Sequence, residues 1–340
     1  MSSNVETTQT VLAESIPTLK LVGGSSDDVP QWINELRTRG WTVVPKAIPK
    51  ERALHYANEA YNWLESWNQG YSRHDSSTRT AKHLPYTHRA GIFARYGIAH
   101  EQFVWDLKSE PGLVEKFEQI WGTKELLVSY DGLNLSVPEN GRPKTDPAFA
   151  PWAHVDQSPL RSNLQCIQGI LNLLPNGPED GGLMVFDGSN RLYEELWEHF
   201  DHKKGEKGWN TWEQQFLDEE MCAWLESKGC KWVKVCAGPG DLLLWDSRCV
   251  HYGATPSSTN DRFAAYVCYK PTALVSDQAK KQREEAWALK ENTPHDPAIL
   301  RRLQRDPPED HPTYEQYKAR GLQEPVLSKR GKQLAGLAPY

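Results

Sequence analysis

The sequence lacks the features that mark several classes of protein. It contains no run of about 18 apolar residues, the length that a membrane-spanning helix needs. It has no long block of Lys or Arg, and its net charge is −6, so neither nucleic acid nor an anionic membrane is an expected partner. Its first residues, MSSNVETTQT, have neither a basic start nor an apolar core, so we expect no secretory signal and a cytoplasmic location.

Paired cysteines are also lacking. The six cysteines include no CxxC pair, and in a chain of 340 residues they do not suggest a disulfide scaffold or a structural zinc site. We therefore expect reduced thiols. Cys249 lies two residues before a histidine of interest, but a small packing residue is the favoured interpretation over a redox or ligand role.

The pattern of apolar residues divides the chain into four parts, without an internal repeat. Residues 1–27 are polar and predict a flexible tail, and residues 28–275 predict the main domain, which begins with helical segments. Within this domain, residues 191–230 are charged, rich in Trp and predicted to be a helical insertion. Residues 276–340 predict a helical and irregular extension, which is where a contact between copies in a homo-oligomer would form.

Short strand-like runs dominate from about residue 126. They are LLVSYDGLNLSV, LQCIQGILNLL, GGLMVF, WVKVCA, DLLLW and RFAAYVCYK, and turn residues separate them. This spacing predicts an antiparallel sandwich or barrel rather than a parallel sheet with alternating helices. The expected architecture is one mainly β core with flanking helices.

The tripeptide HxD occurs twice, and its context separates the two copies. Side chains at i and i+2 share a face on a strand but not on a helix. His199 and Asp201 lie in YEELWEHFDHKKG, which predicts a solvated helix end, whereas His154 and Asp156 lie in APWAHVDQSP just ahead of the strands. His154 and Asp156 can therefore converge on one metal ion.

A third metal ligand has to come from another segment. The candidate is His251, which follows the strand DLLLW, although a histidine beside a buried strand is often an ordinary core residue. Arg262 favours the functional interpretation, because it begins the apolar strand RFAAYVCYK and a buried cation there needs an anion. Its guanidinium can bind a carboxylate through two hydrogen bonds. Two histidines and a carboxylate with open positions form the metal site of non-haem iron oxygenases.

Several motifs taken together resemble those of a known family. They are RGWTVVPKAIPKE, HVD, GGLMVFDGSNR and GPGDLLLWDSRCVHYG, followed by Arg262 eleven residues after His251. Over about residues 28–272 the sequence resembles the phytanoyl-CoA dioxygenase family of iron(II)- and 2-oxoglutarate-dependent oxygenases. The resemblance implies a double-stranded β-helix core of the jelly-roll or cupin type. It also implies Fe(II), held by His154, Asp156 and His251, with 2-oxoglutarate as co-substrate and O2 as oxidant.

The resemblance further assigns co-substrate contacts. Arg262 matches the residue that pairs with the distal carboxylate of 2-oxoglutarate, Gln168 falls at a further co-substrate contact, and Asn134 aligns more loosely with another. The chain departs from the family pattern at Gly253, where a hydroxyl-bearing residue is frequent, and in FDGSN, where the family often has PGSH. Asp156 occupies the position that halogenases of the superfamily leave open for chloride, so halogenation is not expected.

The implied reaction is oxidation of a small organic substrate by hydroxylation, or by desaturation or cyclisation. A carboxylic acid, an amino acid or a specialised metabolite fits better than a coenzyme A thioester, although an acyl-CoA hydroxylase stays an alternative. Arg89 and Arg95 lie among aromatic residues at 79–100 and are candidates to anchor a substrate carboxylate, if this segment is not simply a solvated basic loop. A zinc hydrolase and a non-catalytic ligand-binding β-core also remain open.

Overall fold

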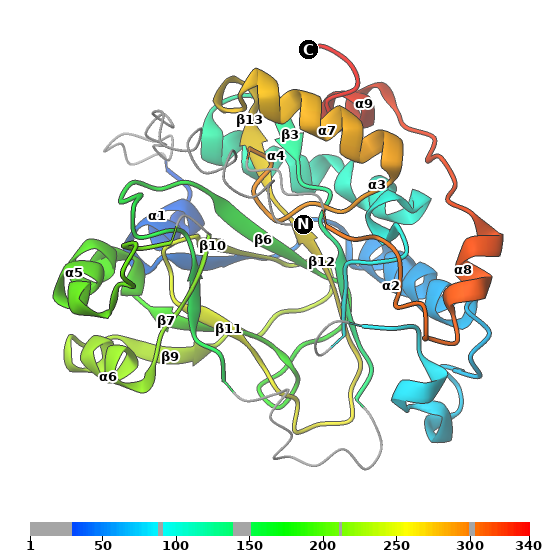
Figure 1. Ribbon diagram of the computed structural model, residues 1–340, viewed down its shortest axis with the longest axis horizontal. Helices are drawn as coiled ribbons and strands as arrows, with labels where there is room; N and C mark the ends of the chain where they lie inside the picture. Colours follow the sequence, from blue (N-terminus) through cyan, green and yellow to red (C-terminus); the bar gives the residue numbers. More distant parts are fainter. Residues whose placement is uncertain (1–28, 88–90, 139–150, 211–212, 299–302) are drawn as a thin grey trace.

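A computed structural model describes residues 29–87, 91–138, 151–210, 213–298 and 303–340. The expected tail at 1–27 lies outside these residues, and so does Arg89. Figure 1 shows strands at the centre of the molecule and helices around them.

Two sheets form the centre of the fold, and every strand pairing among the described residues is antiparallel. The first sheet has six strands in the order β1 (Trp41–Val44), β10 (Leu242–Asp246), β6 (Ile167–Asn172), β12 (Arg262–Val267), β4 (Leu133–Ser136) and β2 (Ile92–Phe93). The second sheet has five strands in the order β8 (Gln214–Phe216), β5 (His154–Asp156), β11 (His251–Ala254), β7 (Gly182–Asp187) and β9 (Lys231–Lys234). A separate pair joins β3 (Leu126–Val128) to β13 (Tyr269–Pro271). These pairings confirm the sheet-rich organisation that the short strand-like runs predict.

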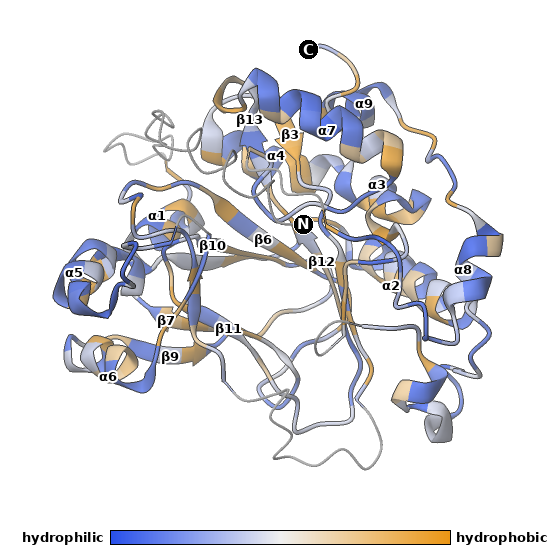
Figure 2. Ribbon diagram, viewed as in Figure 1, coloured by the Kyte–Doolittle hydropathy of each residue, from blue (hydrophilic) through white to orange (hydrophobic). Residues whose placement is uncertain are grey.

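The helices lie around the outside of the two sheets (Figure 1). They are α1 (Gln31–Arg39), α2 (Lys50–Glu65), α3 (Gln102–Lys108), α4 (Pro111–Trp121), α5 (Tyr193–His199), α6 (Glu219–Ser227), α7 (Asp277–Leu289), α8 (Tyr314–Arg320) and α9 (Lys329–Ala335). Helix α8 lies at the edge of the molecule beyond α2 (Figure 1). The largest hydrophobic cluster joins α2, α3 and α4 to the first sheet, and a smaller one joins α5 and α6 to the second sheet. Figure 2 shows that the outward side of α7 is hydrophilic.

Alternation along the central strands decides which side chains lie between the sheets. On β6, Ile167 and Leu171 join the core beneath the helices, whereas Ile170 belongs to the cluster between the sheets. Gln168 has the same parity as Ile170 and lines a cavity there. Because side chains alternate with a period of two, a polar residue at this parity has to face the second sheet.

The segment 191–230 is more than a helical insertion. It contains α5 and α6, as expected, but also β8, which pairs with β5 so that Phe216 lies opposite His154. The strand was missed because it is only three residues long and follows a charged stretch. Its position at the edge of the second sheet places it beside the cavity.

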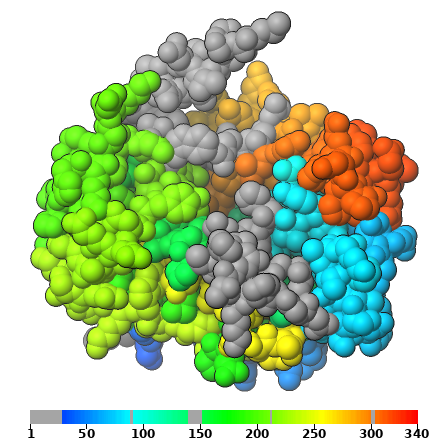
Figure 3. All heavy atoms as spheres, turned by 60° about the horizontal axis from the view of Figure 1, so that its bottom comes forward, coloured from blue at the N-terminus to red at the C-terminus, as the bar shows by residue number. Residues whose placement is uncertain are grey.

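The C-terminal extension packs into the same body as the β core. Trp287, Tyr317 and Leu334 belong to the largest hydrophobic cluster, and the guanidinium of Arg283 donates to the carbonyl of Val128 at 2.8 Å. Figure 3 shows part of the extension (orange) beside the segment near residues 75–100 (cyan), and Tyr96 N donates to Arg305 O at 2.6 Å. Among the described residues, no helix is long and apolar enough to cross a membrane.

Candidate metal centre

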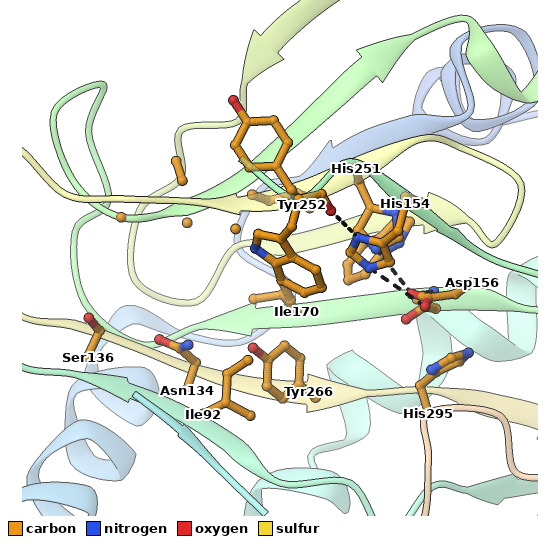
Figure 4. A pocket seen from close by; sticks show the side chains of 18 of the residues that line it. Ile92, Asn134, Ser136, His154, Asp156, Ile170, His251, Tyr252, Tyr266 and His295 are labelled. Atoms are coloured by element: carbon orange, nitrogen blue, oxygen red, sulfur yellow. Dashed lines mark hydrogen bonds and ion pairs between the residues drawn. The ribbon is translucent and has the colours of Figure 1, made fainter. Parts of the chain in front are cut away.

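Three metal-ligating side chains meet on the inner face of the second sheet. His154 and Asp156 are the ends of the short strand β5, so their side chains share one face. His251 begins β11 and lies directly opposite His154 in the strand register. One donor atom from each of the three residues lies within 4.8 Å of the others. Figure 4 shows the two imidazoles and the carboxylate directed toward one another.

Both histidines are oriented by main-chain carbonyls. Nδ1 of His154 lies 3.0 Å from the carbonyl oxygen of Trp152, and Nδ1 of His251 lies 2.9 Å from that of Cys249. A carbonyl only accepts hydrogen bonds, so each Nδ1 is a donor, and each Nε2 is the nitrogen that faces the Asp156 carboxylate. The two Nε2 atoms lie 3.7 Å and 3.1 Å from the oxygens of Asp156. A metal-binding histidine uses this arrangement, with one nitrogen bonded to the protein and the other to the ion.

The protonation states also suit a metal ligand set. Burial, followed by the neighbouring His251, lowers the pKa of His154 to about 3, so its imidazole is neutral near pH 7. Burial alone would raise the pKa of Asp156, but His154 and His295 nearby hold it well below its usual value. Neutral imidazoles and an ionised carboxylate are the forms that bind a divalent metal ion.

The co-substrate contact expected at Gln168 has a different partner in the structure. Its amide nitrogen donates to Oδ2 of Asp156 at 2.8 Å across the space between the two sheets. Gln168 is 6% exposed and lines the cavity. It therefore fixes the orientation of the carboxylate that the metal ion would bind.

A cavity of about 240 Å³ lies between the sheets and contains all three candidate ligands. The side chains around it come from both sheets, and four of them are aromatic: Trp152, Trp245, Tyr252 and Tyr266. The ring of Trp152 stacks on that of His154, with centroids 4.2 Å apart and planes 9° from parallel. Aromatic side chains therefore form part of the cavity wall beside the candidate metal ligands.

Arg262 lies in the same cavity, at the start of β12. It is 6% exposed, its Nε has no hydrogen-bond partner, and it forms no salt bridge to a carboxylate of the described residues. Burial lowers its pKa, and Tyr266 opposes that effect. Gly182, with φ of +136°, lies beneath the guanidinium, where an added Cβ would be 3.0 Å from Nε. A buried cation without a counter-ion needs an anionic ligand.

The comparison with protein families agrees with this geometry. The model of the phytanoyl-CoA dioxygenase (PhyH) family matches residues 36–264, which include all three candidate ligands and both sheets up to the first half of β12. The chain belongs to the PhyH family. It is also 36% identical over 278 residues to Ava biosynthesis cluster protein O of Aspergillus versicolor. The aligned region covers 78% of this chain and 86% of that protein.

Solved structures share the fold of this PhyH protein at low sequence identity. GlcNAc Inducible Gene 2, GIG2 (DUF1479), from Candida albicans matches with a TM-score of 0.57 and 14% identity, covering 92% of this chain and 77% of that one. EctD from S. alaskensis, solved with bound Fe, matches with a TM-score of 0.51 and 16% identity, covering 76% and 83% of the two chains.

Other residues singled out in the sequence lie away from the cavity. His199 ends α5 and stacks on Trp224 with ring centroids 5.3 Å apart, so the second HxD copy is not part of the metal cluster. The guanidinium of Arg95 donates to the carbonyl of Asp306 and lies over the ring of Tyr86. Arg95 is therefore engaged with the C-terminal extension, and it is not among the cavity residues.

Two further residues singled out in the sequence, Cys249 and Asn134, have defined contacts in the structure. The Sγ of Cys249 lies 3.6 Å from Ser189 Oγ, and the residue is fully buried in the cluster between the sheets, in keeping with a packing role. Asn134 lies on β4 opposite Ala264 and lines the cavity beside Tyr266, with which it forms a hydrogen bond.

Reasoning from the sequence missed two ionisable residues of the cavity lining. Asp131 lies between β3 and β4, and His295 lies in the C-terminal extension. Asp131 is three residues before Asn134 in YDGLN, so its place beside an inward-facing strand offered a signal. No pattern around His295 connects it to the β core.

Proposed function

We propose that this chain is an Fe(II)- and 2-oxoglutarate-dependent dioxygenase that oxidises a small organic molecule. The observation that carries the proposal is the pairing of two features in one cavity. One is a His-Asp-His cluster whose ligand atoms lie within 4.8 Å of one another, and the other is a buried arginine without a counter-ion among the described residues. A zinc hydrolase needs the cluster but not the arginine, whereas a dicarboxylate co-substrate accounts for both.

Each side chain then has a defined task. His154, Asp156 and His251 hold the metal ion, and the Trp152 and Cys249 carbonyls together with Gln168 hold these ligands in place. Arg262 binds the distal carboxylate of 2-oxoglutarate through its guanidinium, and Tyr266 and Asn134 form the hydrogen-bonding surface beside it. When bound, iron would couple the oxidative decarboxylation of 2-oxoglutarate to the oxidation of the substrate. The protein contributes position and the exclusion of water.

The finer assignments follow from the family and from one relative. The two antiparallel sheets are proposed to be the halves of a double-stranded β-helix, with the metal site between them. A place in specialised metabolism is supported by the relative named as a biosynthesis cluster protein. Hydroxylation is the simplest outcome, and desaturation or cyclisation begins from the same removal of a hydrogen atom.

The proposal is tested by measuring succinate formed from 2-oxoglutarate by the purified full chain with Fe(II) and O2. We expect succinate to depend on Fe(II) and on air, and replacement of the metal by Zn(II) to abolish it. His251→Ala should lose this activity and the binding of Fe(II), while His199→Ala, the matched change in the other HxD copy, should keep both. Turnover that does not need iron, or that survives in His251→Ala, would refute the assignment.

A further inference from the structure

Ionisable side chains gather at the end of the cavity away from Arg262. Asp131 and His295 line this end, and Glu213 immediately precedes the lining residue Gln214. Figure 4 shows His295 and Ser136 at opposite ends of the cavity, and Ser136 is the strand partner of Arg262. The three side chains come from three separate segments, and none of them has a task in the function proposed above.

His295 is held in place by its sequence neighbours. Two residues before it, Thr293 N donates to Tyr130 O at 3.0 Å, and Thr293 Oγ1 accepts from Tyr130 N at 3.1 Å. One residue after it, Asp296 forms a buried salt bridge to Lys270 at 2.7 Å. A loop pinned on both sides of one residue presents that side chain in a fixed orientation, as a binding site requires.

Two polar atoms in this cluster have no partner among the described residues. They are Nε2 of His295 and Oε1 of Glu213, and both are buried. A buried polar atom without a hydrogen bond destabilises the fold, so two such atoms from separate segments indicate a ligand that completes them.

The electrostatics of the cluster favour one kind of ligand. Burial raises the pKa of Glu213 to about 7, against the opposing influence of His295. Burial alone would lower the pKa of His295, but the carboxylates of Asp156, Glu213 and Asp131 together raise it above its usual value. Three carboxyl groups, those of Asp131, Asp156 and Glu213, therefore surround one imidazole, and an added carboxylate would be repelled.

We propose that Asp131, Glu213 and His295, the acid–histidine subsite, bind a group of the substrate that both donates and accepts hydrogen bonds: an amide or a hydroxyl of an uncharged molecule. Its N–H or O–H donates to Glu213, and its oxygen accepts from His295. The inference rests on the proposed function, because it places the substrate beside the metal ligands. Among the described cavity residues other than the candidate metal ligands His154 and His251, Arg262 and His295 are the ones that can carry positive charge. No further cation lies there to bind a carboxylic acid or the phosphates of a coenzyme A thioester.

The first test compares ligands that differ only in the polar group. The probes are 3-phenylpropylamine, 3-phenylpropionamide and 3-phenylpropionate, with the matching indole series, and their binding to the Zn(II)-loaded full chain with 2-oxoglutarate is measured by ligand-observed NMR. One hydrogen bond to a charged group corresponds to roughly tenfold or more in affinity, so we expect the amides to bind at least about tenfold more tightly than the acids and the amines, neither of which can pair with both Glu213 and His295. Equal binding of the three forms, or no binding of any amide, would overturn the proposal.

The second test uses near-isosteric variants. Glu213→Gln and His295→Gln should each reduce the preference for the amide over the acid about tenfold or more. Glu220→Gln, on the exposed side of α6, is the matched control and should change nothing. If His295→Gln does not fold, Glu213→Gln and the wild-type ligand series still decide. If neither variant loses the ligand preference, the proposed subsite is refuted. If the wild type forms no iron-dependent succinate, the proposed function is refuted instead.

Discussion

The side-chain amide of Gln168 donates a hydrogen bond of 2.8 Å to Oδ2 of Asp156, joining the first sheet to the metal-binding strand of the second. The carboxylate would otherwise be free to rotate about its last torsion angle. With Gln168 in place, its oxygens lie 3.7 Å and 3.1 Å from the Nε2 atoms of His154 and His251. The glutamine therefore prepares the ligand geometry before the metal ion binds.

Gln168→Leu should weaken Fe(II) binding about 10- to 100-fold, the effect typical of removing a partner that orients a metal ligand. Titration of the apo protein with Fe(II) under anaerobic conditions measures this. The matched control is Gln165→Leu, because Gln165 is equally buried but bonds to the carbonyl of Asn163. If Gln168→Leu instead leaves Fe(II) binding intact and raises only the KM for 2-oxoglutarate, the co-substrate role implied by the family resemblance would be the better one.

Arg262→Leu should raise the KM for 2-oxoglutarate far more than it lowers Fe(II) affinity. Losing one partner of a buried charge-assisted pair costs roughly 2–5 kcal/mol, and Arg262→Lys should recover only part because an ammonium group lacks the planar fork. Steady-state kinetics of succinate release measure the effect. Arg330→Leu, which breaks a pair with Glu118 far from the cavity, should leave the KM unchanged. An unchanged KM in Arg262→Leu would exclude this residue from the co-substrate site.

The metal cluster could be predicted from the sequence because its signals are local. His154 and Asp156 are two residues apart on a strand, and the strand DLLLW delivers His251. Alternation also placed Gln168 on the inner face, but it could not say which partner the amide would meet. That partner, Asp156, is on the other sheet, and strand parity carries no information about pairing between sheets.

Asp131 offered a signal, but His295 and Glu213 could not be predicted, because long-range contacts and a very short strand place them. The position of His295 depends on Thr293 pairing with Tyr130 and on Asp296 pairing with Lys270. These contacts join residues more than a hundred positions apart in one case, and they leave no periodic pattern. Glu213 was missed with β8, because a three-residue strand after a charged stretch has too little pattern to be recognised.

Acid should destabilise the protein in part through His100. Its ring is 3% exposed and Nε2 lies 2.9 Å from the Glu291 carbonyl. Burial, together with Lys290, Lys108 and Arg305 nearby, lowers its pKa to about 3 against the effect of that hydrogen bond. The unfolded value is about 6.5, so the folded pKa is the lower one. The stability that the neutral ring contributes is complete above about pH 6.5 and is lost as the pH falls toward 3.

In the His100→Gln variant, the free energy of unfolding should therefore fall less steeply as the pH is lowered. Between pH 7 and 4.5, we expect the wild type to lose about 2 kcal/mol of unfolding free energy more than the variant does. Urea unfolding at a series of pH values measures the difference. His74→Gln, at an exposed position, is the control and should follow the wild type. Parallel curves for the wild type and His100→Gln would show that His100 is not the group responsible.

The buried salt bridge between Lys270 and Asp296 gives the last prediction. Both side chains are at most 2% exposed, the ammonium reaches both carboxylate oxygens, and the carboxylate also accepts from the main-chain nitrogen of Ala298. Asp296→Ala leaves the Lys270 charge buried and unpaired, so it should lower the free energy of unfolding by roughly 3–5 kcal/mol. Chemical denaturation of the full chain measures this loss.

The double variant Lys270→Met/Asp296→Leu should recover most of that stability, because two apolar side chains of similar size avoid the desolvation of both charges. It should not restore the amide preference of the acid–histidine subsite, because the loop that presents His295 loses its ionic anchor. Asp277→Ala, which removes an exposed pair with Lys280, is the control and should affect neither property. Recovery of stability together with full ligand preference would mean that the Thr293 contacts alone position His295.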